Sequence, residues 1–240
     1  MKISVIIPAF NEERLLGRTL AQVKSAMSAF TRRGWGAELI VCDNHSTDRT
    51  AEIARAAGAT VVFEPFNQIA RARNAGAAAA TGDWLIFVDA DSLPGAELFA
   101  DVAEQIQAGR CFAGGATVRM DEKHLLVEFF TWTWNWSSRM GRWLAGSFIF
   151  VEAAVFRKIG GFNNDLFAGE ELDLSKRLKR LARETGREIV ILHSHPLLTS
   201  ARKMRLYTVW DHLKLLVHVI FNRRALNRRE SCTLWYDGRR

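Results

Sequence analysis

Trp84-Leu85-Ile86-Phe87-Val88-Asp89-Ala90-Asp91 is the stretch that decides the fold of this 240-residue chain. Five consecutive apolar residues indicate a strand that is buried on both faces, and two carboxylates follow where the strand ends. In open α/β sheets, the carboxyl ends of the strands form the edge that binds ligands. Paired carboxylates at that edge suit Mg²⁺ or Mn²⁺, which in turn can hold a diphosphate. The same two acids also fit a solvated turn, so the rest of the chain has to decide between the two interpretations.

Strand and helix patterns alternate on both sides of this stretch. We expect strands at residues 2–7, 38–42, 60–63 and 84–88, and helices at 13–30, 51–57 and 68–80. Repeated β-α-β units predict an α/β fold with a Rossmann-like, doubly wound and mostly parallel sheet.

The second half of the chain is less regular. We expect strands at residues 111–120, with a break at Gly114-Gly115, and at 146–151 and 188–192, and helices at 170–183 and 206–221. The aromatic segment 124–143 is ambiguous, because Trp132, Trp134 and Trp136 would share one face of a strand but spread around a helix. It fits core packing, an acceptor pocket or a membrane interface.

Positive charge is concentrated at the end of the chain. From Ser200 onward there are ten basic and three acidic residues, which is the whole formal net charge of +7. The expected helix at 206–221 has an apolar stripe, so it fits an anionic membrane surface or the back of the sheet. We therefore expect one domain over residues 1–200 and a basic amphipathic helical appendage over residues 201–240.

The compartment is inferred from the cysteines and from hydropathy. Cys42, Cys111 and Cys232 are an odd number at irregular spacing, which fits a reducing compartment and core positions for the first two. No apolar run is long enough to predict a transmembrane helix. We expect a cytoplasmic protein, with peripheral attachment at the inner face of the cell membrane as an open alternative.

Several short motifs fall where the expected sheet would present its carboxyl edge. They are Pro8-Ala9-Phe10-Asn11-Glu12-Glu13, Asp43-Asn44-His45-Ser46-Thr47-Asp48, Arg73-Asn74-Ala75-Gly76, Asp89-Ala90-Asp91 and Gly169-Glu170-Glu171-Leu172-Asp173-Leu174. Each motif is weak alone, but five in this order are specific.

The set resembles the inverting glycosyltransferases of family 2, which have the GT-A fold, and the resemblance covers roughly residues 1–200. It implies transfer of a sugar from a nucleoside diphosphate sugar, with UDP favoured, to an acceptor hydroxyl, assisted by Mn²⁺ or Mg²⁺. The acceptor is open among a polysaccharide, a lipid-linked sugar and a small molecule. Two alternatives are a polyprenyl-phosphate glycosyltransferase using GDP-mannose or UDP-glucose, and a sugar-nucleotide-binding protein without catalysis. No nucleic-acid partner is expected.

The resemblance also implies roles for individual residues in donor binding. Asp43 would accept hydrogen bonds from the base, Arg73 would contact phosphate or uridine, and Asp89 would reach the ribose or the water around the metal. The loop that frames base and ribose would contain Pro8, Phe10 and Glu12. The alternatives, in which neither residue binds a ligand, are a turn-forming Asp43 and an exposed Arg73 on an Ala-rich helix.

Metal binding and catalysis are assigned in the same way. Asp91 would be the direct metal ligand and would assist the leaving group through the cation, and His195, beyond the last expected strand, is a further metal candidate. Glu171 would be the general base, although the family pattern has Asp there, and Glu170 would replace it if the register differs. The alternative is that these acids only complement the dipole of a helix.

Overall fold

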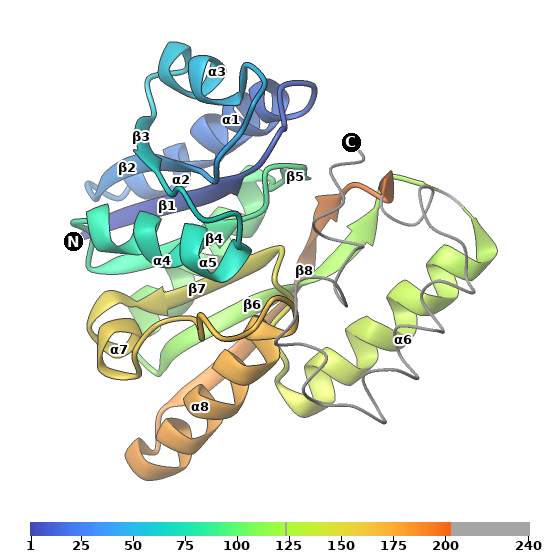
Figure 1. Cartoon of the computed structure of the whole chain (residues 1–240). Coiled ribbons are helices and arrows are strands. Elements are labelled where there is room, and N and C mark those ends of the chain that lie inside the picture. The colour runs from blue at the N-terminus through green and yellow to red at the C-terminus, as the bar shows by residue number, and fades with distance from the viewer. Residues whose placement is uncertain (123, 203–240) are drawn as a thin grey trace.

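In the computed structural model, the strands form one sheet in the order β3-β2-β1-β4-β7-β6-β8-β5 (Figure 1). The structure describes residues 1–122 and 124–202. The strands are β1 (Lys2–Ala9), β2 (Gly36–Asp43), β3 (Thr60–Phe63), β4 (Trp84–Val88), β5 (Ser92–Leu93), β6 (Cys111–Met120), β7 (Phe148–Glu152) and β8 (Glu188–Thr199). The helices are α1 (Leu16–Ala26), α2 (Ser28–Thr31), α3 (Thr50–Ala56), α4 (Ile69–Ala79), α5 (Ala96–Ala108), α6 (Leu125–Gly141), α7 (Ala153–Lys158) and α8 (Glu170–Thr185).

The sheet is mixed but mainly parallel, as predicted. Strands β1 to β4 are mutually parallel, with β1 between β2 and β4, and β6 is parallel to β8. Strand β7 is antiparallel to both β4 and β6, and the short β5 is antiparallel to β8. The chain reverses its direction of winding between β1 and β4, so the loops after these strands border the crevice where such sheets bind ligands.

Alternation along the strands divides the core between the two faces of the sheet. Ile3, Val5 and Ile7 of β1 belong to the apolar cluster that includes residues of α1, α2, α3 and α5, whereas Ile6 belongs to the cluster that includes residues of α4, α7 and α8. The helices therefore cover both faces of the sheet, which leaves its carboxyl edge for the loops.

The structure differs from the sequence-based expectations at several places, and the short elements β5 and α7 were not predicted. Helix α5 was not predicted, the aromatic segment is the helix α6, and β8 continues well past residue 192 to Thr199. The expected break at Gly114-Gly115 is wrong, because β6 runs through both residues. A side chain at Gly114 would collide with the ring of Phe150 on β7, so the glycine permits close strand packing and does not end the strand.

Part of the expected C-terminal appendage lies outside the described residues. This holds for the expected helix at 206–221 and for Cys232, whereas Ala201 and Arg202 are described. Cys42 and Cys111 are buried in β2 and β6, as expected for core residues. Among the helices described in residues 1–202, none is long and apolar enough to span a bilayer.

Candidate functional site

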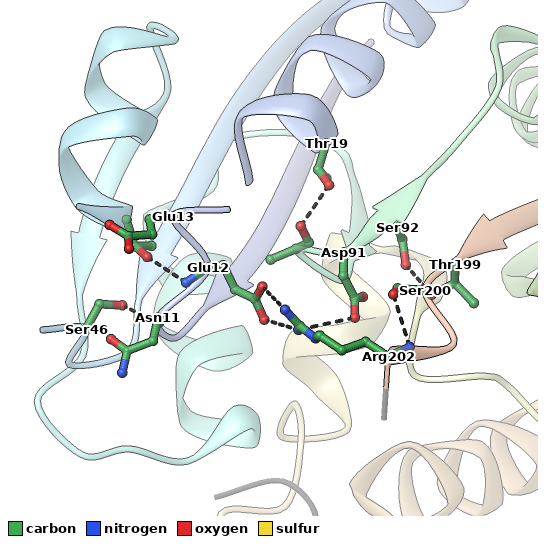
Figure 2. Close-up of polar contacts among 12 residues, drawn as sticks. Asn11, Glu12, Glu13, Thr19, Ser46, Asp91, Ser92, Thr199, Ser200 and Arg202 are labelled. Atoms are coloured by element: carbon green, nitrogen blue, oxygen red, sulfur yellow. Dashed lines mark hydrogen bonds and ion pairs between the residues drawn. The ribbon is translucent and has the colours of Figure 1, made fainter. Parts of the chain in front are cut away.

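The loops after β1 and β2 are bound to one another at the carboxyl edge of the sheet (Figure 2). The backbone N–H of Asn11 donates to Ser46 Oγ at 3.0 Å, and its side-chain oxygen accepts from the backbone N–H of Thr47 at 2.8 Å. The backbone N–H of Glu12 donates to Thr50 Oγ1 at 2.8 Å. Two motifs that lie more than thirty residues apart in the sequence therefore form one surface.

Asp43 lies at the end of β2 and closes the second of these loops. Its side chain is buried, and Oδ1 accepts a hydrogen bond from the backbone N–H of Ser46 at 3.0 Å. His45 has a positive φ of 66°, and its Nδ1 is 2.8 Å from the carbonyl oxygen of Pro65. The turn thus fixes the Asp43 carboxylate at the carboxyl edge of the sheet.

Pro8 and Phe10 lie next to this turn. Pro8 is within β1, opposite Cys42 of β2, and Phe10 follows the last residue of the strand. Two of the three residues predicted for the loop that frames base and ribose, Pro8 and Phe10, therefore lie next to the partner of Asp43, since Asp43 is opposite Ala9 in the same register. The structure thus places Pro8, Phe10 and Asp43 close together at the ends of β1 and β2.

Arg73 of α4 links Asp89 and Glu170, two of the acids that the motifs predict at the carboxyl edge of the sheet. Its guanidinium donates to Glu170 Oε1 at 2.6 Å and to Asp89 Oδ1 at 2.9 Å, and also to the carbonyl oxygen of Gly146 at 2.8 Å. Only 1% of the Arg73 side chain is exposed, so the alternative of an exposed helix arginine is wrong. Burial opposes its charge, but Asp89, Glu170 and Glu171 outweigh burial and raise the pKa of Arg73. The arginine stays charged and holds the two carboxylates in place.

The rest of the Arg73 motif explains why the sequence is Arg-Asn-Ala-Gly. The Asn74 side chain donates to the carbonyl oxygen of Phe162 at 2.8 Å and accepts from its N–H at 2.9 Å, which fixes the loop before α8. A methyl group at Gly76 would lie 2.5 Å from Ile6 Cγ2, so only glycine allows α4 to pack this closely on β1. Each of these three residues positions the site through a different neighbour.

Asp89 and Asp91 have different surroundings. Asp89 is tied to Arg73, and its backbone N–H donates to the carbonyl oxygen of Ser147 at 3.2 Å. Asp91 lies on the other side of the loop, where its Oδ2 is 3.6 Å from the guanidinium of Arg202. Its side chain is 14% exposed, so a ligand can reach it from the edge.

Arg202 is a site residue that the sequence analysis missed, because it was counted as part of the basic tail. Its two terminal nitrogens donate to the two carboxylate oxygens of Glu12, at 2.7 and 3.0 Å. Figure 2 shows its guanidinium between Glu12 and Asp91. The extended strand β8 brings Arg202 to this position. Its last residue, Thr199, makes a 2.9 Å hydrogen bond to Ser92, which follows Asp91 directly. Once β8 is known to reach Ser92, the position of Arg202 follows.

Glu170 and Glu171 open α8 beside Arg73, and their surroundings differ. Glu170 is buried and paired with Arg73, whereas Glu171 is partly exposed. Burial, followed by repulsion from Glu170, raises the pKa of Glu171 to about 8. A carboxylate whose pKa lies near the pH of the solution is suited to proton transfer.

His195 is not brought to the acids of the edge. Its Nδ1 lies 2.9 Å from Asp101 Oδ2 of α5. It precedes Thr199 by four residues in β8, a distance of about 13 Å in an extended strand. The prediction that His195 binds the metal is not supported by this placement.

The residues at the edge fit a divalent cation that is only partly held by the protein. In the described part of the chain, no group of three His, Cys, Asp or Glu side chains is arranged to hold a metal ion. Asp91 and Asp89 nevertheless supply hard oxygen ligands, and Mg²⁺-type sites use one or two carboxylates together with substrate phosphates and water. The donor set therefore fits an ion that binds together with a diphosphate.

Comparisons with known proteins agree with this geometry. Validoxylamine A glucosyltransferase of Streptomyces hygroscopicus subsp. jinggangensis is 26% identical over 230 residues, covering 73% of this chain and 51% of its own. The chain spans about half the length, or less, of the curated relatives that it matches.

Two solved structures share the fold. The mannosyltransferase PcManGT from Pyrobaculum calidifontis, solved with GDP-Man and Mn²⁺, superposes with a TM-score of 0.68 at 18% identity, covering 97% of this chain and 69% of its own. Glucosyl-3-phosphoglycerate synthase from Mycobacterium tuberculosis, in complex with Mn²⁺, UDP and glucosyl-3-phosphoglycerate, gives a TM-score of 0.62 at 20% identity, covering 92% of this chain and 77% of its own. The expected GT-A fold is confirmed.

The family model described as Glycosyl transferase family 2 matches residues 4–152, which contain the first four of the five motifs. With the sheet order, the motif geometry and this match in agreement, the chain belongs to glycosyl transferase family 2.

Proposed function

We propose that this protein transfers a sugar from a nucleoside diphosphate sugar, with UDP as the favoured nucleotide, to an acceptor hydroxyl with inversion at the sugar. The observation that carries the proposal is the convergence of Asp43, Asp89, Asp91 and Glu171 on one edge of the sheet, where Arg73 holds Asp89 and the neighbouring Glu170. The two solved neighbours support a nucleotide-sugar donor, because one holds GDP-Man and the other UDP.

Each group of the edge has a role in this reaction. Asp43 accepts hydrogen bonds from the base, and Pro8 and Phe10 frame it. Asp91 binds Mn²⁺ or Mg²⁺ directly, and Asp89 reaches the ribose or the water around the ion. When bound, such an ion stabilises charge on the departing diphosphate. We assign Arg73 the task of holding Asp89 and Glu170, since its terminal nitrogens already donate to them.

Glu171 is proposed as the general base that takes the proton of the acceptor hydroxyl. Glu170 is held by Arg73 at 2.6 Å, whereas Glu171 lies beside it with a raised pKa. Removing the proton as the hydroxyl oxygen attacks the anomeric carbon in line, opposite the diphosphate, gives inversion. The longer Glu at this position, where the family pattern has Asp, moves the carboxylate by about one bond length.

We also propose a lipid-linked or polysaccharide acceptor and peripheral attachment at the inner face of the cell membrane. The support is the basic composition of the chain beyond the domain, where nine basic residues follow Arg202. A polyprenyl phosphate acceptor is the second candidate.

The test is a thermal-shift panel of the purified full chain with UDP-, GDP- and dTDP-sugars, with and without Mn²⁺. A Mn²⁺-dependent shift by one nucleotide class, followed by release of that nucleotide on adding acceptor, supports a transferase. Binding without any release of nucleotide over a range of acceptors would favour the non-catalytic alternative.

A further inference from the structure

Helix α6 presents a wide apolar face to solvent. Large side chains on it are 49–84% exposed, namely Leu125, Leu126, Phe129, Phe130, Trp132, Trp136 and Met140. At 3.6 residues per turn, these positions fall within a sector of about 160°. The two charged residues of α6, Glu128 and Arg139, lie outside that sector. An exposed patch of this size on one helix is typical of an interaction surface.

The exposure is a property of a firmly attached helix. On the opposite side of α6, the Asn135 side chain donates to the carbonyl oxygen of Val118 at 2.8 Å and accepts from its N–H at 2.9 Å. Trp134 packs against the core, and Ser138 Oγ donates to the carbonyl oxygen of Trp143 at 2.6 Å. The helix is thereby fixed in rotation on β6, and its apolar face is held outward.

A basic pocket adjoins the C-terminal end of this face. It has a volume of about 410 Å³, and the residues lining it include Met140, Arg142, Lys179, Arg183, Arg187 and Glu188. Met140 is also the last member of the apolar face, so the two features are continuous. Arg187 is paired with Glu152 and is therefore neutralised. By contrast, burial, and then the positive charges of Arg183 and Lys176, lower the pKa of Lys179. Cations crowded in this way favour an anionic ligand.

We infer that the apolar face of α6 and the basic pocket at its end together form a docking surface for an anionic lipid bilayer. The aromatic and aliphatic side chains enter the boundary between headgroups and acyl chains, and Arg142, Lys179 and Arg183 contact lipid phosphates. Trp and Phe on one face, with basic residues at its border, is the pattern of an interfacial helix. The inference does not depend on the proposed transfer reaction.

Charge decides between the bilayer and the other occupants of this face. The C-terminal segment of this chain is itself strongly basic, so its approach to the basic pocket would be repelled. An anionic membrane is attracted by the pocket and by the basic segment alike. The bilayer is therefore the occupant whose charge fits both regions.

The test is co-sedimentation of the full chain with phosphatidylcholine vesicles that contain or lack phosphatidylglycerol. We expect binding to the anionic vesicles that weakens with salt. Trp132→Ser with Trp136→Ser, and separately Arg142→Gln with Lys179→Gln and Arg183→Gln, should each weaken that binding by about 10-fold or more. Arg142→Lys with Arg183→Lys should retain it.

Two matched controls make the same chemical changes elsewhere. Phe63→Ser with Phe66→Ser removes two exposed aromatic side chains, and Arg18→Gln with Arg32→Gln and Arg55→Gln removes three exposed charges. Both should bind the vesicles like the wild type. Circular dichroism and unfolding curves confirm that each variant is folded.

Three outcomes would overturn the inference. Unchanged binding by both α6-face and pocket variants, with loss on changing Arg223, Arg224, Arg228 and Arg229 to Gln, would assign lipid binding to the C-terminal segment alone. If light scattering shows that the wild type is a dimer and that Trp132→Ser with Trp136→Ser is a monomer, the face would be assigned to a second copy of this chain. Equal binding of free phosphate and of vesicles at the pocket, without an effect of the tryptophans, would leave only a phosphate site.

Discussion

Arg202 forms a two-pronged ion pair with Glu12, with N–O distances of 2.7 and 3.0 Å between residues 190 positions apart. Both side chains are largely buried, at 16% and 6% exposed. Arg202→Gln should therefore lower the free energy of unfolding by about 3 kcal/mol, because it leaves a buried carboxylate without its partner. Urea unfolding of the full chain measures the effect.

The matched control is the double variant Arg202→Gln with Glu12→Gln, which removes both charges. It should recover most of the loss, because the Glu12 charge that Arg202 neutralised is removed together with it. If the double variant were less stable than the single one, the two residues would act independently and the pairing would carry no special weight.

Asp91 should be required for metal-dependent donor binding. Asp91→Asn keeps the shape of the side chain but removes a carboxylate ligand, so Mn²⁺-dependent binding of UDP should be lost while the fold is kept. Isothermal titration calorimetry with and without Mn²⁺ checks this. His195→Gln is the comparison, and it should leave the affinity unchanged, because His195 is paired with Asp101. Weakened binding in His195→Gln would mean that the histidine moves to the metal.

Glu171→Gln should retain donor binding and lower kcat by about 100-fold or more, the usual effect of removing a general base. Glu170→Gln is expected to act differently. It removes the repulsion that helps to raise the pKa of Glu171 and frees Arg73, so the rise of kcat/KM with pH should move to lower pH. A pH profile of both variants separates the roles, and loss of turnover only in Glu170→Gln would reverse the assignment of the base.

Glu171 should also make stability depend on pH. Its folded pKa, about 8, is above its ordinary value of 4.5, so between these values the folded state binds more protons than the unfolded state. Stability therefore falls as pH rises through this window. Glu171→Gln removes this dependence, so the variant should be more stable than the wild type at pH 9, and the difference should vanish near pH 4.5. Thermal unfolding across this range is the measurement, and equal curves would contradict the raised pKa.

Gly76 should tolerate no side chain. Gly76→Ala would place a methyl group 2.5 Å from Ile6 Cγ2, and forcing α4 away from β1 should cost about 1–3 kcal/mol of stability. Gly17→Ala in α1 is the control, since its methyl group would meet its nearest neighbour at 3.8 Å. That change should stabilise the protein by about 0.5–1 kcal/mol, because alanine loses less backbone entropy in a helix. Chemical denaturation of both variants tests the pair.

The sequence predicted what depends on local patterns. The buried run before Asp89 and the alternating elements predicted the sheet, and motif order predicted that Asp43, Asp91 and Glu171 would share one edge. It could not predict Arg202, because the link to Glu12 requires β8 to extend through a polar His-Ser-His-Pro stretch. That extension is stabilised by pairing with β6 across a register shift, a tertiary effect without a local signal.

Burial of charged residues was also beyond local reasoning. Arg73 follows an Ala-rich pattern that suits a solvent-facing position, but its acceptors come from the loop after β4, from α8 and from the loop before β7. Only the assembled fold supplies three acceptors that make burial of a guanidinium favourable. The same holds for the direction of the α6 tryptophans, which is set by Asn135 and Val118.

The ion pair between Glu12 and Arg202 also sets when the site can form during synthesis. The ribosome adds 190 residues between the two partners, which takes roughly 10–40 s at ordinary rates of translation. Once residue 88 has been added, strands β1 to β4 are available to pair, while Glu12 and Asp91 still lack Arg202, which follows β8. A nascent chain can therefore pair its first four strands before the ion pair between Glu12 and Arg202 can form, so this part of the carboxyl edge is completed only after β8 has been synthesised.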